Sequence, residues 1–496
     1  DVYKRQGLRM RDVTPARHIP ETTRPSTLVD ALPRFGAPGS RSAALHRAGI
    51  SDEGVRASVV ELNRFALLRW LGAVGTLLIG LGGLGGGALP VVDNPWFDLP
   101  GGAFMGRMLQ ASSSLVLIGV GCLVVAWLLM GPFVGAGTNH ARISARVVFR
   151  TFLVWAAPLL LTAPLFTQDI YSYLAQGSIV RQGLDPYAAG PVELLGTENR
   201  LARSVPFIWA HSPSPYGPVA LGIASAVSWI TQDSIYFGVL CHRVLSLVGV
   251  VAAAWGIRAL ARRCGVHGAT ALWLGVLNPL AILHLIAGIH NESIMLGFLL
   301  VGMEVGLRGI DALAAGGQRR RGWALFLLSG ALLSCGGLVK VTGFIALGFT
   351  GMALARVWAR GGGKRASISA ICTAALVQAG CLAVTAGLIS WFTGIGLGWV
   401  TGQGGAATIR SWLSLTTDIG VISGVTGMLL QLGDHTEAIL GITRGVGLLV
   451  AGAFLVRMLW ATFRGSIHPV GGLGVATLVL VLLFPVVHPW LSLIHI

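Results

Sequence analysis

The chain has 496 residues, of which 54% are hydrophobic and only 11% charged, and its mean hydropathy is +0.73. Soluble domains carry about 25% charged residues, whereas this sequence repeatedly shows apolar stretches of roughly twenty residues, the length that crosses a bilayer. This composition predicts an all-α polytopic membrane protein. The high apolar content excludes a wholly disordered chain and a collagen repeat. A disulfide scaffold is excluded as well, because the six cysteines show no CxxC or other ligand spacing.

The net charge of +16 lies in clusters that border the apolar stretches, as in cytoplasmic loops, and the pattern does not resemble a nucleic-acid groove. Residues 1–62 are rich in Pro, Arg, Ser and Thr and are interpreted as a disordered basic cytoplasmic tail. Residues 63–496 form the predicted transmembrane domain. Because the chain begins with Asp1 and stops within an apolar element at LSLIHI, we expect a fragment truncated at its C-terminus.

Eleven membrane crossings are predicted by length and apolarity. Two further apolar stretches, 217–230 and 412–432, are interpreted as interfacial or re-entrant, because full crossings there would turn the basic clusters between them outward. The loop 167–216 then lies outside, against the membrane face. The predicted crossings are about 65–87, 113–134, 148–166, 236–260, 269–289, 293–307, 323–340, 343–357, 367–390, 437–458 and 470–487.

This topology brings several polar residues to the outer membrane face. Polar side chains at membrane depth are costly and tend to mark function, so one extracytoplasmic site is expected there. These residues are Asp169, Asp185, Arg243, His290, Asn291, Glu292, Lys340, Arg444 and His488.

Asp169 leads the candidates for a catalytic carboxylate. It directly follows an apolar stretch in APLFTQDIYSY, where a partly desolvated carboxylate could abstract a proton. A helix N-cap explains the residue equally well. Asp185, which precedes a proline, is interpreted as part of a turn.

The consecutive His290, Asn291 and Glu292 place an imidazole, an amide and a carboxylate between two predicted helices. They could bind a divalent cation, Mg²⁺ or Mn²⁺, together with Asp169, or they could bind sugar hydroxyls. The alternative is a hydrated helix cap. Asp169 and Glu292 are the only metal-ligand candidates, and the sequence does not decide whether a metal is required.

Lys340 stands in the apolar segment SCGGLVKVTGF of a chain that otherwise uses Arg almost throughout. A specific anion partner is expected, and a lipid phosphate would suit Lys340 and Arg243 near the outer leaflet. The alternative is snorkelling toward headgroups, which fits Arg444 better. Tyr187 could stack on a sugar ring or belong to an interfacial aromatic belt, to which Tyr171 and Trp209 are assigned.

In combination, the motifs TQDIYSYLAQG, SPSPYGP, HNES, GGLVKVTGF and PVVHPW resemble the actinobacterial polyprenol-phosphomannose-dependent α-1,6-mannosyltransferases, which are GT-C glycosyltransferases. The resemblance spans about residues 65–490. It implies a GT-C helical bundle in the plasma membrane that moves mannose from a polyprenyl-phosphate-mannose donor to an α-mannan glycolipid acceptor of lipomannan and lipoarabinomannan. Asp169 matches the family's first-loop acid, and His488 belongs to a late motif.

The resemblance implies that the acid at Asp169 acts as a base or helps to hold a metal. Transfer from a lipid phosphate needs a base for the acceptor hydroxyl and a cation for the departing phosphate, so Asp169 is predicted to be the base, and Lys340 with Arg243 to stabilise the phosphate. His290, Asn291, Glu292, Tyr171, Tyr187 and His488 complete the predicted substrate-binding set. A GT-C transferase for another polyprenyl-phosphate sugar, such as arabinofuranose, stays open. A lipid-linked sugar transporter or flippase is a further alternative, although it should show inverted repeats, which the sequence lacks.

Overall fold

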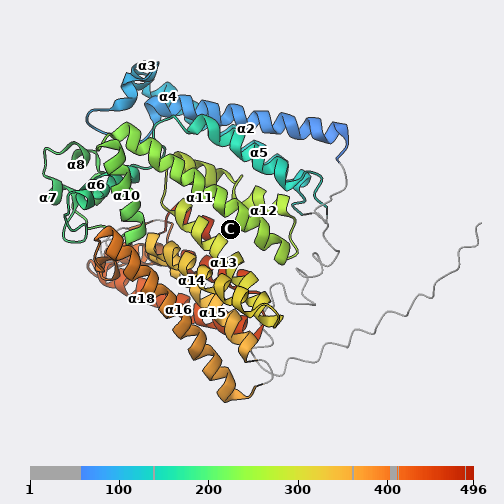
Figure 1. Ribbon diagram of the computed structural model, residues 1–496. Coiled ribbons are helices and arrows are strands. Elements are labelled where there is room, and N and C mark those ends of the chain that lie inside the picture. The colour runs from blue at the N-terminus through green and yellow to red at the C-terminus, as the bar shows by residue number, and fades with distance from the viewer. Residues whose placement is uncertain (1–56, 138–139, 360–361, 403–409, 412, 486) are drawn as a thin grey trace, which may run out of the picture. The chain divides into compact units, whose positions relative to one another are not determined.

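In the computed structural model, every regular element of the described part of the chain is a helix (Figure 1). Most of the predicted tail lies outside that part. The predicted tail boundary at residue 62 moves, because helix α2 begins at Val59, where Ser58 and Glu61 form a capping box. The described residues are 57–137, 140–359, 362–402, 410–411, 413–485 and 487–496.

Eight helices among the described residues are long and apolar enough to cross a membrane, and each overlaps a predicted crossing. The all-α polytopic prediction is thereby confirmed. The eight are α2 (Val59–Gly86), α4 with the turn after it (Leu109–Val134), α11 (Ile235–Arg263), α13 (Glu292–Ala314), α14 (Arg319–Val339), the span Val341–Trp358 that contains α15 (Ile345–Trp358), α16 (Lys364–Thr393) and α18 (Thr436–Arg464).

The other three predicted crossings are not continuous long helices. A proline lies where each helical run breaks, at Pro158, Pro279 and Pro485, since proline lacks the N–H that a helix needs. Asn278 marks the second break further, because its side chain accepts a hydrogen bond from Leu280 N. The three pieces are α5 (Ala145–Ala156), α12 (Gly268–Gly275) with a π-helical segment (Ala281–Ala287), and α19 (Pro469–Leu483).

The first broken segment still connects the same two levels as α2. At the start of α2, Glu61 pairs with Arg142, just before α5. Just past the end of α2, Ala88 N donates to Pro164 O (2.7 Å). Residues 142–164 therefore run the full length of α2, even though only part of the segment is helical.

The other two broken segments run between the same levels. The α12 segment begins where Thr270 Oγ1 donates to Val134 O, and it ends where Leu165 N donates to Ala287 O. The α19 segment begins at His468, next to Cys264 just past the end of α11.

Shorter helices follow Asp169 in the predicted outer loop. α10 and α17 have 14 and 15 residues, fewer than a crossing needs, and their interfacial placement stays a prediction. These shorter helices are α6 (Asp169–Arg181), α7 (Pro191–Leu195), α8 (Arg200–Ser204), α9 (Phe207–Ala210), α10 (Pro218–Thr231) and, later in the chain, α17 (Leu415–Leu429).

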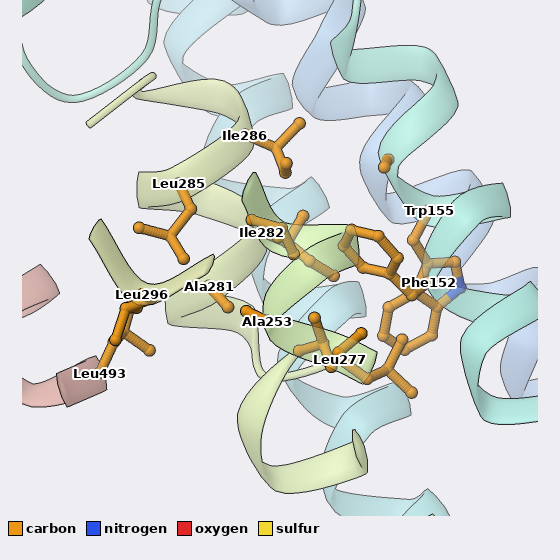
Figure 2. Close-up of a cluster of buried hydrophobic side chains, with 14 of the residues drawn as sticks. Phe152, Trp155, Ala253, Leu277, Ala281, Ile282, Leu285, Ile286, Leu296 and Leu493 are labelled. Atoms are coloured by element: carbon orange, nitrogen blue, oxygen red, sulfur yellow. The ribbon is translucent and has the colours of Figure 1, made fainter. Parts of the chain in front are cut away.

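The largest buried cluster joins α5 to the α12 segment. Figure 2 shows Phe152 and Trp155 of α5 with Leu277 and Ile282, all of them buried. This apolar packing holds the α5 and α12 segments together. The residues that follow them, Thr162–Asp169 and Ala287–Glu292, therefore lie at the same level of the bundle.

Candidate active site

A cavity of about 230 Å³ opens at the level of the bundle where α6 begins. It is lined by residues of α6, of the 209–216 segment, of the segment after α14 and of the C-terminal half of α19. Phe484, Pro485, His488, Trp490 and Leu491 complete the lining. Its apolar wall includes Ile345, Leu480, Val481 and Phe484, and a few polar side chains, among them Asp169 and Lys340, also line it. A cavity with one apolar wall and a few polar groups suits an amphiphilic ligand.

Asp169 is the first residue of α6, and its carboxylate lines the cavity. Oδ1 accepts a hydrogen bond from Trp209 Nε1 (3.0 Å), and Oδ2 lies 3.6 Å from His290 Nδ1. The side chain makes no capping bond to the helix, contrary to the N-cap alternative. Burial raises the pKa of Asp169, and the Trp209 hydrogen bond opposes that shift. The carboxylate is thus desolvated and oriented, as a general base requires.

His290 lies between helices next to Asp169 and stacks on Trp490. The two rings stack with centroids 3.8 Å apart, and His488 stacks on Trp490 at 4.5 Å. Burial lowers the pKa of His290 to about 3, so the imidazole is neutral. Trp490 and His488 line the cavity, while His290 supports the site from behind.

Lys340 lines the cavity directly after the last residue of α14. Its Nζ donates to Glu292 Oε1 (2.5 Å), the first residue of α13. Glu292 is only 1% exposed, whereas the lysine side chain is 27% exposed. The anion partner expected for Lys340 is therefore Glu292, and the other two N–H groups of the ammonium bond to no described residue.

The described residues do not fit a divalent metal site. No group of three or more His, Cys, Asp or Glu side chains among them converges on one point. Of the two predicted ligands, Glu292 already contacts an ammonium and Asp169 already accepts an indole N–H. These contacts use one oxygen of each carboxylate, and the oxygens that remain do not belong to any group of three or more ligands among the described residues.

Six of the predicted substrate-binding residues lie outside the lining of this cavity, and His290 and Glu292, described above, are two of them. Arg243 is buried, and its guanidinium donates to backbone carbonyls, the nearest being Thr162 O at 2.6 Å. The hydroxyls of Tyr171 and Tyr187 also donate to backbone carbonyls, and Asn291 is buried just before α13. These contacts indicate structural roles. The carbonyls involved are Leu160, Thr162, Ile286 and Ala287 for Arg243, Ala88 for Tyr171 and Tyr216 for Tyr187.

Sequence reasoning missed several residues of the lining. Trp209 was assigned to the aromatic belt, yet it binds the carboxylate of Asp169. Ser172 and Gln176 were not singled out, although they follow Asp169 by three and seven residues, which places all three on one face of α6. Asp185 forms the expected turn, in which its side chain accepts from Tyr187 N.

Comparison with known families gives two matches. Residues 69–356 match the family described as alpha-(1->6)-mannopyranosyltransferase, N-terminal domain, and residues 416–494 match the MptB C-terminal domain. No solved structure gives a significant match, and the GT-C arrangement stays a prediction.

Curated relatives cover most of this chain. Alpha-(1->6)-mannopyranosyltransferase B of Corynebacterium glutamicum is 59% identical, over 96% of this chain and 83% of its own length. An alpha-(1->6)-mannopyranosyltransferase of Mycobacterium tuberculosis is 40% identical, over 88% of this chain and 78% of its own length. A probable alpha-(1->6)-mannopyranosyltransferase of Mycolicibacterium smegmatis is 41% identical over the same shares.

Proposed function

Because the chain belongs to the alpha-(1->6)-mannopyranosyltransferase family, we propose that it is a membrane mannosyltransferase that uses polyprenyl-phosphate-mannose as donor and an α-1,6-mannan glycolipid of the lipomannan type as acceptor. The observation that carries this proposal is the shared cavity of Asp169 and Lys340. Transfer from a lipid phosphate needs a base for the acceptor hydroxyl and a cation for the departing phosphate, and the two residues supply these groups.

In the proposed reaction, Asp169 accepts the proton of the acceptor hydroxyl while the hydroxyl oxygen forms a bond to the anomeric carbon of mannose. The bond between that carbon and the phosphate oxygen breaks, and the phosphate leaves on its lipid. Lys340 stabilises the phosphate with the N–H groups that Glu292 does not use. Glu292 holds the ammonium in position.

The apolar wall of the cavity supports a lipid-borne donor. Ile345 belongs to α15, while Leu480 and Val481 belong to α19, both of which are helices of the membrane body. A polyprenyl chain against this wall would keep its phosphate near Lys340 while its remainder stays in the bilayer. Holding the donor there converts a bimolecular encounter into an oriented one.

The arrangement of the charges supports an extracytoplasmic site. Arg263 pairs with Asp311 (2.6 Å) where α11 and α13 end, whereas Glu292 lies at the opposite end of α13. The basic clusters end α11, begin α14 and end α18, so they lie at the level opposite the cavity. By the positive-inside rule, the basic level faces the cytoplasm, so in the plasma membrane the cavity faces the outside of the cell.

The test is a transfer assay with membranes that contain the full-length protein, radiolabelled polyprenyl-phosphate-mannose and a short α-1,6-mannose acceptor. We expect labelled mannose on the acceptor. Polyprenyl-phospho-arabinofuranose serves as the competing donor, and transfer of arabinose in place of mannose would contradict the proposal. Movement of the intact donor across the membrane without any transfer would favour a flippase.

A further inference from the structure

The polar face of α6 carries more hydrogen-bonding groups than the proposed reaction uses. Asp169, Ser172 and Gln176 all line the cavity, and their spacing of three and seven residues places them on one face of the helix. One turn of a helix rises about 5.4 Å, so the face extends about two turns beyond the carboxylate.

Ser172 is the first unexplained group. The residue is 4% exposed, and its Oγ has no hydrogen-bond partner among the described residues. A buried hydroxyl without a partner is destabilising, because it has lost its hydrogen bonds to water and gained none in return. Because Ser172 lines the cavity one turn from Asp169, a bound ligand can supply the missing partner.

Gln176 is the second unexplained group. Its Oε1 accepts a hydrogen bond from Ser214 Oγ (3.1 Å), which fixes the amide. No described residue accepts from its Nε2, so the amide keeps two N–H donors. The residue is 5% exposed, and it too lines the cavity.

The chemistry of these two groups identifies the class of ligand. A hydroxyl and an amide are neutral, whereas the cation that suits a phosphate, Lys340, comes from a different element. Neutral donors and acceptors in a row suit the hydroxyls of a sugar ring. The ligand must also bring a hydroxyl to Asp169 on the same helix face, and in the proposed reaction that molecule is the acceptor.

We propose that the cavity face of α6 is the acceptor subsite, where Ser172 and Gln176 hydrogen-bond ring hydroxyls of the mannose that attacks. The two side chains then determine acceptor specificity, while Lys340 and the apolar wall hold the donor. This assignment rests on the proposed function.

The test compares Ser172→Ala and Gln176→Leu with wild type, and measures KM separately for the acceptor and the donor. Each variant should raise the KM for a short α-1,6-mannose acceptor by about 3- to 10-fold, since a neutral hydrogen bond contributes about 0.5–1.5 kcal/mol, with the donor KM unchanged. Ser214→Ala is the comparison variant, because it removes the bond that fixes the amide and keeps the amide itself, so it should raise the acceptor KM less than Gln176→Leu does.

Acceptors that lack one ring hydroxyl sharpen the result. In wild type, the acceptor that lacks the hydroxyl bound by Ser172 should have a higher KM than the full acceptor. In Ser172→Ala, these two acceptors should have the same KM. An unchanged acceptor KM in both variants, or a rise in the donor KM alone, would overturn the assignment while wild-type transfer continues. Failure of wild type to transfer mannose would instead reject the proposed function.

Discussion

The Asp169 carboxylate is held by contacts from two elements far apart in the sequence. Trp209 donates to one oxygen and His290 lies near the other, so removing the negative charge need not disturb the fold. We expect Asp169→Asn to reduce transfer by about 10²- to 10⁴-fold, because the amide keeps the shape and cannot accept a proton. Asp185→Asn, in the turn of the same loop, is the control and should retain activity. Near-normal transfer by Asp169→Asn would exclude the carboxylate as the base.

The hydrogen bond from Trp209 should be visible in the pH profile. Burial raises the pKa of Asp169 and the indole N–H lowers it, so Trp209→Phe should raise it further. The base works only when deprotonated, so activity is lost as pH falls through this pKa. The acidic limb of kcat/KM should therefore move to higher pH in Trp209→Phe. A limb that stays in place would show that the indole does not act on the carboxylate.

Lys340 is tested together with its partner, because removing only one member of a buried ion pair is itself destabilising. Lys340→Met should lose about 10- to 100-fold in turnover, since a hydrogen bond to a charged group contributes about 1.5–3 kcal/mol. Lys340→Arg should recover only part, as a planar guanidinium does not replace a compact ammonium. The double variant Lys340→Met/Glu292→Gln should regain stability and stay slow. Full activity of the double variant would place the phosphate elsewhere.

At this scale the sequence identifies residue types better than their partners. Asp169 and Lys340 were found because a charge in an apolar segment is costly and therefore conspicuous. Their contacts with Trp209 and Glu292 join positions 40 and 48 residues apart, and only the folded chain brings these together. Arg243 was predicted to bind the phosphate for the same reason, but its buried guanidinium donates to backbone carbonyls, and the sequence does not distinguish these two kinds of acceptor.

The packing of α2 on α4 depends on glycines that let the two backbones approach. A Cβ added at Gly119 would lie 2.5 Å from Gly75 O, whereas a Cβ at Gly121 would meet nothing within 4 Å. Gly119→Leu should therefore lower the unfolding temperature of the purified protein markedly, at an overpacking cost of about 1–3 kcal/mol or more. Gly121→Leu on the same helix should change little. Equal stability of the two variants would contradict this close packing.

Helices were predicted well where apolar stretches are uninterrupted, and less well where proline intervenes. Averaged hydropathy identifies a crossing over 269–289 but does not register that Asn278 and Pro279 divide it into two pieces. The prolines that mark these breaks are visible in the sequence. The contacts that let the pieces span the bundle, such as Thr270 to Val134, are not.

The whole molecule separates a basic level from a level that holds the cavity. In the part of the chain that the structure describes, eight long helices and three broken segments run between these levels. The site is assembled where segments that are distant in the sequence reach the same level. The sequence predicted this separation from charge clusters alone. The cavity also needs His488, Trp490 and Leu491 to lie across from α6, and no local sequence pattern predicts that they do.

Side-specific transfer in proteoliposomes tests the central claim most directly. A cysteine in place of Gln182, at the end of α6, reports by labelling which face each molecule presents, and Gly316→Cys reports the opposite face. With radiolabelled polyprenyl-phosphate-mannose in the bilayer and an impermeant α-1,6-mannose acceptor added outside, mannose transfer should follow the fraction of molecules labelled at position 182 and vanish in Asp169→Asn. Transfer that follows the fraction labelled at position 316, or that persists in Asp169→Asn, would contradict the account.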